Sequence, residues 1–196
     1  MILNYLDKIP VISRKAFIFK NAVLSGDITV GDFSSVWFGT VIRGDVNFVK
    51  IGSGTNIQDN SCIHVTTEKF PTIIGDNVTV GHAVTVHGSV IDSNVLIGMG
   101  SVLLDGCRVK NHSILAAGSV LKPGTTIPEG VLAAGNPAEI KRELKPEERA
   151  FFKKSADSYI KYSERYLTYS SKSIYTYDEI FDILDGLKSY TKGEQK

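Results

Sequence analysis

The sequence predicts an all-β fold, a parallel β-helix, that is followed by a C-terminal α-helical extension. A six-residue repeat runs from Ile12 to Val131, and each hexad opens on an aliphatic residue. The fifth residue of each hexad is small or β-branched, which is a second sign of the same period. Beyond Pro146 the pattern changes to aromatic residues on largely helical spacing. A repeat of this length is typical of a solenoid in which each coil stacks on the one before it.

The hexads fall into four runs, which three changes of register separate. Their openers are Ile12, Ile18, Leu24, Val30, Val36, Ile42, Ile51, Ile57, Ile63, Ile74, Val80, Val86, Ile91, Ile97, Leu103, Val109, Leu115, Leu121 and Ile127. Their fifth residues are Ala16, Ala22, Ile28, Ser34, Thr40, Val46, Thr55, Ser61, Thr67, Val78, Val84, Val90, Val95, Ser101, Cys107, Ser113, Ser119, Thr125 and Val131. We expect the first and fifth positions to point inward and the second and third to lie on the outer surface. Three hexads make one triangular coil, and the repeat predicts about six coils at a rise of roughly 4.8 Å.

Glycine at the second position of a hexad suits a corner where the chain must turn without a Cβ atom. These glycines are Gly31, Gly52, Gly75, Gly81 and Gly98. Hexapeptide repeats of this type resemble the left-handed β-helix family, an exception to right-handed crossovers. The resemblance implies a left-handed parallel β-helix. We place this domain at residues 1–136, with residues 1–11 covering the open end of the first coil.

Residues 137–196 are predicted to form a helical extension that packs on the prism. Pro146, with two glutamates after it, is typical of a helix start, and this helix should continue to about Tyr169. A shorter helix is expected from about Tyr177 to Lys188, followed by a frayed tail at residues 192–196. The aromatic residues of the first helix are expected to pack against the prism wall rather than to line a ligand site.

Composition excludes several classes of function. The net charge of +1 gives no electrostatic reason to bind nucleic acid or an anionic membrane. The apolar N-terminal residues are interrupted by Asn4, Asp7 and Lys8, so we expect neither a signal peptide nor a spanning helix. Cys62 and Cys107 look like unpaired thiols in a reducing compartment. These observations predict a cytoplasmic protein. The expected substrate is a small molecule.

Three of the four histidines lie close together in the repeat. His64 and His87 both occupy the second position of hexads that are one full coil apart, so both side chains should project from the same face. Arg43 holds the same position one coil earlier and extends this column. Asp59 and His82 occupy the third position, again one coil apart, and form a second column with Gln58 beside it.

Two stacked imidazoles can share one divalent metal ion, and catalytic zinc sites use three protein ligands with an open position for water. His82 lies around the corner from the other two histidines, so it is better placed to reach the pair of a neighbouring chain. We therefore predict a homotrimer with metal sites at the subunit interfaces, where metal-bound water acts as a hydroxide nucleophile. Alternatively, these histidines are ordinary surface residues. His112 is interpreted as a surface residue, and the Arg43–Asp45 segment could be an ordinary exposed turn.

At these residues the sequence resembles the γ-class carbonic anhydrases and their short-loop bacterial relatives. The matching stretches are Val41-Ile42-Arg43-Gly44-Asp45, Asn56-Ile57-Gln58-Asp59, His64, Val80-Gly81-His82 and His87. The resemblance implies that His64 and His87 bind zinc from one subunit and His82 from the next, with iron or cobalt as alternative metals. It also implies that Arg43, Asp45 and Asp59 form salt bridges between subunits near the metal. Gln58 matches a residue that hydrogen-bonds the metal-bound water.

Two departures from the family pattern concern proton transfer. Val46 stands where the best-characterised members carry glutamate, and the loop Thr67–Pro71 replaces a longer acidic loop. Glu68 is its only acid, and Tyr159 of the C-terminal helix is a further candidate for a catalytic proton carrier. The leading hypothesis is reversible hydration of carbon dioxide. The alternatives are an acyltransferase or thioesterase acting on a CoA thioester, whose superfamily shares the Gly135–Ala138 ending, and a metal-stabilised scaffold.

Overall fold

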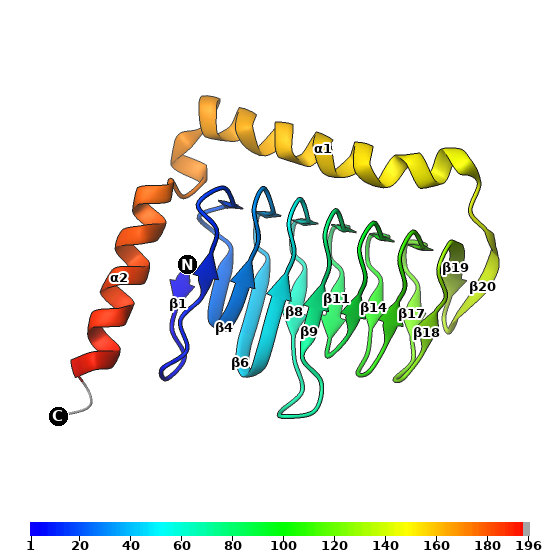
Figure 1. The fold of residues 1–196 in the computed structure, drawn as a ribbon, viewed down its shortest axis with the longest axis horizontal. Coiled ribbons are helices and arrows are strands. Elements are labelled where there is room, and N and C mark those ends of the chain that lie inside the picture. The colour runs from blue at the N-terminus through cyan, green and yellow to red at the C-terminus, as the bar shows by residue number, and fades with distance from the viewer. Residues whose placement is uncertain (194–196) are drawn as a thin grey trace.

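The computed structural model describes residues 1–193 and shows a left-handed parallel β-helix of about seven turns with two helices at its C-terminal end (Figure 1). The predicted fold class is confirmed. The structure has more coils than the six expected, because residues at the N-terminus add strands of their own. Ile2–Leu3 pairs in parallel with Leu24–Ser25, so the lead-in segment belongs to the solenoid.

The strands are short, and most contain two or three residues. They are β1 (Ile2–Leu3), β2 (Val11–Ile12), β3 (Phe17–Ile18), β4 (Val23–Val30), β5 (Ser35–Val36), β6 (Val41–Ile51), β7 (Asn56–Ile57), β8 (Cys62–His64), β9 (Thr72–Ile74), β10 (Thr79–Val80), β11 (Thr85–His87), β12 (Val90–Ile91), β13 (Leu96–Ile97), β14 (Val102–Leu103), β15 (Arg108–Val109), β16 (Ile114–Leu115), β17 (Val120–Leu121), β18 (Thr126–Ile127), β19 (Val131–Gly135) and β20 (Ala138–Glu143). The helices are α1 (Pro146–Tyr169), a 3-10 turn (Ser171–Ser173) and α2 (Tyr177–Gly193).

Successive coils pair in parallel, and the hexad openers lie in register. Ile63 is opposite Val86, Val86 is opposite Leu103, and Leu103 is opposite Leu121. All four side chains are fully buried, so the aliphatic openers form the core of the prism. The pairing becomes antiparallel where β20 folds back on β19 and closes the C-terminal end.

The prediction that every fifth position points inward is wrong at several register changes. Val46 is 39% exposed, because β6 continues straight past this position and Val49 fills the core instead. In the hexad that opens at Ile63, Thr67 is exposed while Val65 is buried. Before Ile91 the hexad has only five residues, so Ser89 takes the buried place.

Glycine at the second position serves a different purpose from the one expected. None of these glycines has a positive φ among the described residues; the positive values fall mainly at the fourth position, as at Asn60, Ala83 and Gly100. A Cβ atom on Gly98 would instead lie 2.3 Å from the backbone nitrogen of Ala117 in the next coil. Glycine is therefore required there by the close stacking of coils, and the turn is made two residues later.

The two helices cover different parts of the prism (Figure 1). Helix α1 runs back along the sheet that contains β5 and β10, and Tyr159 packs edge-on against Trp37 of the wall at 5.4 Å. Helix α2 lies at the N-terminal end, where Ile180 is buried in the main core. No helix among residues 1–193 is long and apolar enough to cross a membrane.

The boundaries of the C-terminal segments agree partly with the sequence. The first helix ends at Tyr169 as predicted, but α2 continues to Gly193 rather than ending near Lys188. The rest of the predicted frayed tail, residues 194–196, lies outside the described residues. The division into domains at residues 1–136 and 137–196 stays a prediction.

Leu103→Ala should lower the free energy of unfolding by about 2–5 kcal/mol, because Leu103 is fully buried and the substitution leaves a cavity between two coils. Val11→Ala is a matched control, since Val11 is 64% exposed and its truncation should change stability by less than about 0.5 kcal/mol. Thermal or denaturant unfolding followed by circular dichroism would measure both. Equal stability of the Leu103 variant and the wild type would contradict the inward orientation of the openers.

Candidate metal centre

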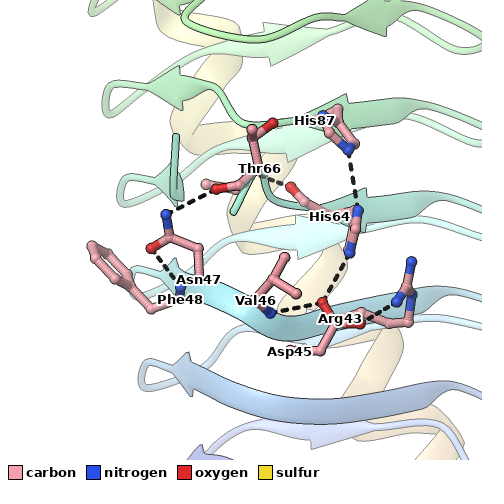
Figure 2. Close-up of polar contacts among 9 residues, drawn as sticks. Arg43, Asp45, Val46, Asn47, Phe48, His64, Thr66 and His87 are labelled. Carbon is pink, nitrogen blue, oxygen red and sulfur yellow. Dashed lines mark hydrogen bonds and ion pairs between the residues drawn. The ribbon is translucent and has the colours of Figure 1, made fainter. Parts of the chain in front are cut away.

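The histidine pair predicted from the repeat is present. His64 ends β8 and His87 ends β11, and the two residues are direct register partners in adjacent coils. The Nδ1 atom of His64 lies 3.1 Å from the Nε2 atom of His87 (Figure 2). Parallel pairing thus places two ring nitrogens face to face on the outer surface of one sheet.

Asp45 supports the first histidine of this pair. Its Oδ1 atom lies 2.9 Å from Nε2 of His64, and its Oδ2 atom accepts a hydrogen bond from the guanidinium of Arg43 (Figure 2). Partial burial raises the pKa of the Asp45 carboxyl, but the His64 hydrogen bond and the Arg43 charge outweigh burial and hold the pKa below its ordinary value. Asp45 is therefore an ionised acceptor at neutral pH, and its two oxygen atoms link Arg43 to His64.

Asp105 supports the second histidine, and sequence reasoning missed this residue. Its Oδ1 atom lies 2.7 Å from Nδ1 of His87 and accepts a hydrogen bond of 2.8 Å from the hydroxyl of Thr66. Burial raises the pKa of Asp105, whereas the hydrogen bonds from His87 and Thr66 lower it, with a net shift below the ordinary value. The register contains the signal, because Leu103 opens the hexad one coil after Val86 and brings Asp105 beside His87.

The remaining predicted residues form a second group on the other sheet. Asp59 and His82 lie in adjacent coils, with Oδ2 of Asp59 2.7 Å from Nδ1 of His82. Asp59 also accepts a hydrogen bond from the backbone N–H of Phe38. Together with Trp37 and Tyr159, both residues line a cavity of about 290 Å³. The predicted second column is thus present, and Tyr159 belongs to it rather than to the His64–His87 pair.

Gln58 lies in the floor of a neighbouring cleft of about 470 Å³ between α1 and the sheet of β7, β10, β13 and β16. The Gln58 side chain is 5% exposed and donates a hydrogen bond of 3.0 Å to Asn56. His82 and Tyr159 line one part of this cleft, and the rest is mainly apolar. Burial raises the pKa of the Tyr159 hydroxyl, and the negative charge of Asp59 raises it further. Tyr159 is therefore protonated at neutral pH.

The histidine pair has the geometry of two metal ligands. Because Nε2 of His64 and Nδ1 of His87 each face a carboxylate, we assign their protons to those atoms, which leaves lone pairs on the facing nitrogens. Two lone pairs 3.1 Å apart repel unless a cation lies between them. Two nitrogens bound to one tetrahedral zinc ion would be roughly 3.3 Å apart, given metal–nitrogen bonds near 2.0–2.1 Å. The pair therefore fits a metal ion of this size.

A single chain does not complete such a centre. Within residues 1–193 no three or more His, Cys, Asp or Glu side chains cluster as a metal site. His64 and His87 belong to the sheet of β8 and β11, whereas His82 follows β10 of the other sheet. The predicted residues are thus divided into two half-sites, which we name the pair half-site (Arg43, Asp45, His64, His87) and the His82 half-site (Gln58, Asp59, His82, Tyr159).

Comparisons with known proteins identify close relatives. The family model "Bacterial transferase hexapeptide (six repeats)" matches residues 88–123. Gamma carbonic anhydrase 2, mitochondrial, of Arabidopsis thaliana is 43% identical over 177 residues, which cover 88% of this chain and 64% of that protein. The chain therefore spans less than two thirds of that plant relative. A crystal structure of a hexapeptide transferase family protein from Anaplasma phagocytophilum has a TM-score of 0.82 and 40% identity, covering 85% of this chain and 98% of the other.

A bacterial relative covers most of both proteins. The carbonic anhydrase of Geobacillus kaustophilus is 41% identical over 144 residues, which are 74% of this chain and 79% of that protein. The hexapeptide solenoid and these identities show that the chain belongs to the γ-carbonic anhydrase family of hexapeptide-repeat proteins.

Proposed function

We propose that this protein is a zinc-dependent carbonic anhydrase that hydrates carbon dioxide reversibly, with iron or cobalt as alternative metals. The observation that carries the proposal is the His64–His87 pair, whose facing nitrogens are 3.1 Å apart and whose outer nitrogens each meet a carboxylate. A carboxylate on the second ring nitrogen is the usual support of a metal-binding histidine. Membership of the γ-carbonic anhydrase family favours this reading over that of ordinary surface histidines.

The third ligand is proposed to be His82 of a neighbouring chain in a homotrimer. The side chain of His82 is 45% exposed, and Asp59 holds its Nδ1 atom, so Nε2 is left to face outward. A closed threefold arrangement repeats one contact three times and joins each pair half-site to one His82 half-site. This assembly would contain three equivalent metal sites, each incomplete without two chains.

When bound at this site, the metal ion would act as a Lewis acid that lets water lose a proton near neutral pH. The residues of the chain would orient the histidine rings and balance the charge around the metal. Asp45 and Asp105 hold the outer ring protons of His64 and His87, and Arg43 balances the Asp45 charge. In the trimer, Gln58 would lie beside the third histidine and offer its amide to water or to bicarbonate.

The purified chain, whose mass is 21.4 kDa, should sediment with the mass of three subunits at micromolar concentration, because the proposed threefold assembly joins each pair half-site to the His82 half-site of a neighbour. Analytical ultracentrifugation would measure this mass in the presence and absence of zinc. A monomer that binds one metal ion per chain through all three histidines would contradict the proposed interface.

Metal analysis of anaerobically purified protein, combined with a stopped-flow assay of carbon dioxide hydration, tests the activity directly. We expect one metal ion per chain and hydration that a chelator removes and added metal restores. Fully loaded protein that shows no hydration in any buffer would exclude the carbonic anhydrase proposal.

Both described cysteines are free thiols, so we propose a reducing, cytoplasmic location.

A second candidate function is an acyltransferase or thioesterase acting on a CoA thioester. The observation that favours it is the apolar cleft of about 470 Å³ beneath α1, which is large enough for a short acyl chain. The Anaplasma relative is also described as a hexapeptide transferase family protein. Hydrolysis or transfer of acyl-CoA substrates by protein that does not hydrate carbon dioxide would favour this candidate.

A further inference from the structure

We propose that Asp105 is a positioning residue that fixes the ring of His87 for metal binding, and that the same carboxylate links this ring to the loop at Thr66. The inference rests on the proposed metal site and extends it to a residue that lies outside both half-sites. The Asp105 Oδ1 atom lies 2.7 Å from Nδ1 of His87 and 2.8 Å from Oγ1 of Thr66. One oxygen atom thus joins a ring of the pair half-site to the Thr66–Phe70 loop.

The backbone holds Asp105 rigidly in this place. Leu103, two residues earlier, is fully buried and in register with Val86, the neighbour of His87. The N–H of Gly106 donates a hydrogen bond of 2.8 Å to the carbonyl oxygen of Gly88, so the corners of the two coils are tied together. The Asp105 carboxylate therefore reaches His87 from a corner whose backbone is held by hydrogen bonds to the neighbouring coil.

Gly88 provides the space that this approach needs. A Cβ atom at Gly88 would lie 2.6 Å from Oδ1 of Asp105 and 2.8 Å from Cβ of Phe70, both closer than normal contact. Gly88 also has a φ of +55°, in the left-handed region that favours glycine. The coil next to His87 thus leaves room for the carboxylate that follows one coil later.

Asp105 decides which nitrogen of His87 can bind a metal. A carboxylate facing Nδ1 keeps the proton on that atom, and Nε2 is left with its lone pair toward His64. Each of the three proposed ligands then has a carboxylate of its own, namely Asp45 for His64, Asp59 for His82 and Asp105 for His87. Outer carboxylates of this kind typically change metal affinity by about 10–100-fold.

Asp105 also has a structural contact that must be separated from this role, because it anchors the Thr66–Phe70 loop through the Thr66 hydroxyl. Thr66→Val removes that hydrogen bond and keeps the bond from Asp105 to His87. Asp105→Ala removes both bonds. Asp92→Asn is a control of similar kind, since Asp92 binds Arg108 at 3.0 Å on another corner of the prism.

The test uses the full-length chain stripped of metal, with the zinc dissociation constant measured by competition with a chromophoric chelator. We expect Asp105→Ala to weaken zinc binding by about 10–100-fold. Asp105→Asn keeps the side-chain shape and an oxygen acceptor, so it should give a smaller loss and replaces the alanine variant if that variant does not fold. Thr66→Val and Asp92→Asn should stay within about twofold of the wild type, with melting temperatures of the metal-free proteins recorded alongside.

Zinc binding by both Asp105 variants that equals the wild type would overturn the proposal. A loss in Thr66→Val as large as that in Asp105→Ala would also overturn it, because loop anchoring alone would then explain the effect. The readout is metal affinity and not activity. Weakened binding in a protein that never hydrates carbon dioxide would support the role of Asp105 and refute the proposed function. Wild-type protein that binds no divalent metal would refute both.

Discussion

His82→Ala and His87→Ala should each abolish tight metal binding by the purified protein while leaving the β-helix folded. Each substitution removes one of three proposed ligands, and catalytic zinc sites depend on all three. The side chains of His82 and His87 are 45% and 34% exposed, so neither truncation opens a cavity in the core. Metal content per chain and circular dichroism melts would measure the two effects separately. His112→Ala is the control, since His112 lies beside Glu129 and beside Phe152 of α1, away from both half-sites.

Mixing the two variants should restore part of the lost binding. A trimer assembled from both chains contains sites in which an intact His64–His87 pair meets an intact His82 from its neighbour. In a closed threefold ring that contains both variants, one of the three sites is complete, so about one third of the wild-type metal content should return. Co-expression with two affinity tags, followed by metal analysis of the doubly selected protein, would test this. No recovery from a mixed trimer would mean that one chain supplies all three ligands.

The repeat predicted more of the site than of the local geometry around it. Because the openers lie in register coil after coil, counting hexads was enough to place His64 beside His87 and Asp59 beside His82. The same count could have found Asp105, whose hexad lies one coil beyond His87. It was missed because aspartate is a common residue at an exposed corner, and only its distance to His87 distinguishes it.

Other features could not be counted from the sequence. The register changes decide which residue fills the core, and at Val46 the strand β6 runs on through 11 residues instead of turning. The distinction between a turning glycine and a close-stacking glycine depends on backbone torsion, as Gly98 and Gly100 show two residues apart. Helix α2 packs against the N-terminal end of the prism through Ile180, and no pattern in the sequence predicts this long-range contact.

The proposed hydration of carbon dioxide should be limited by export of the proton that water loses. Val46 is 39% exposed beside Asp45 and cannot carry a proton, and the neighbouring Thr66–Phe70 loop holds Glu68 as its only acid. The backbone N–H of Glu68 donates a hydrogen bond of 3.4 Å to the carbonyl oxygen of Val46, so the loop lies beside this part of β6. Imidazole buffer should therefore raise the steady-state rate in proportion to its concentration.

Val46→Glu should raise kcat in dilute buffer and have little effect in concentrated imidazole, because a carboxylate at this exposed position can pass protons from the site to solvent. General acid–base assistance is typically worth about 10²–10⁴-fold, which sets the size of the gain to be sought. Val46→Gln is the matched control, since it has nearly the same shape and cannot titrate. Stopped-flow rates over a range of imidazole concentrations would separate the variants. A wild-type rate that is already high in dilute buffer and independent of imidazole would contradict this prediction, because the chain would then contain its own proton carrier. Glu68→Gln and Tyr159→Phe would locate that carrier, since the variant that lacks it should lose the rate in dilute buffer and recover it in imidazole.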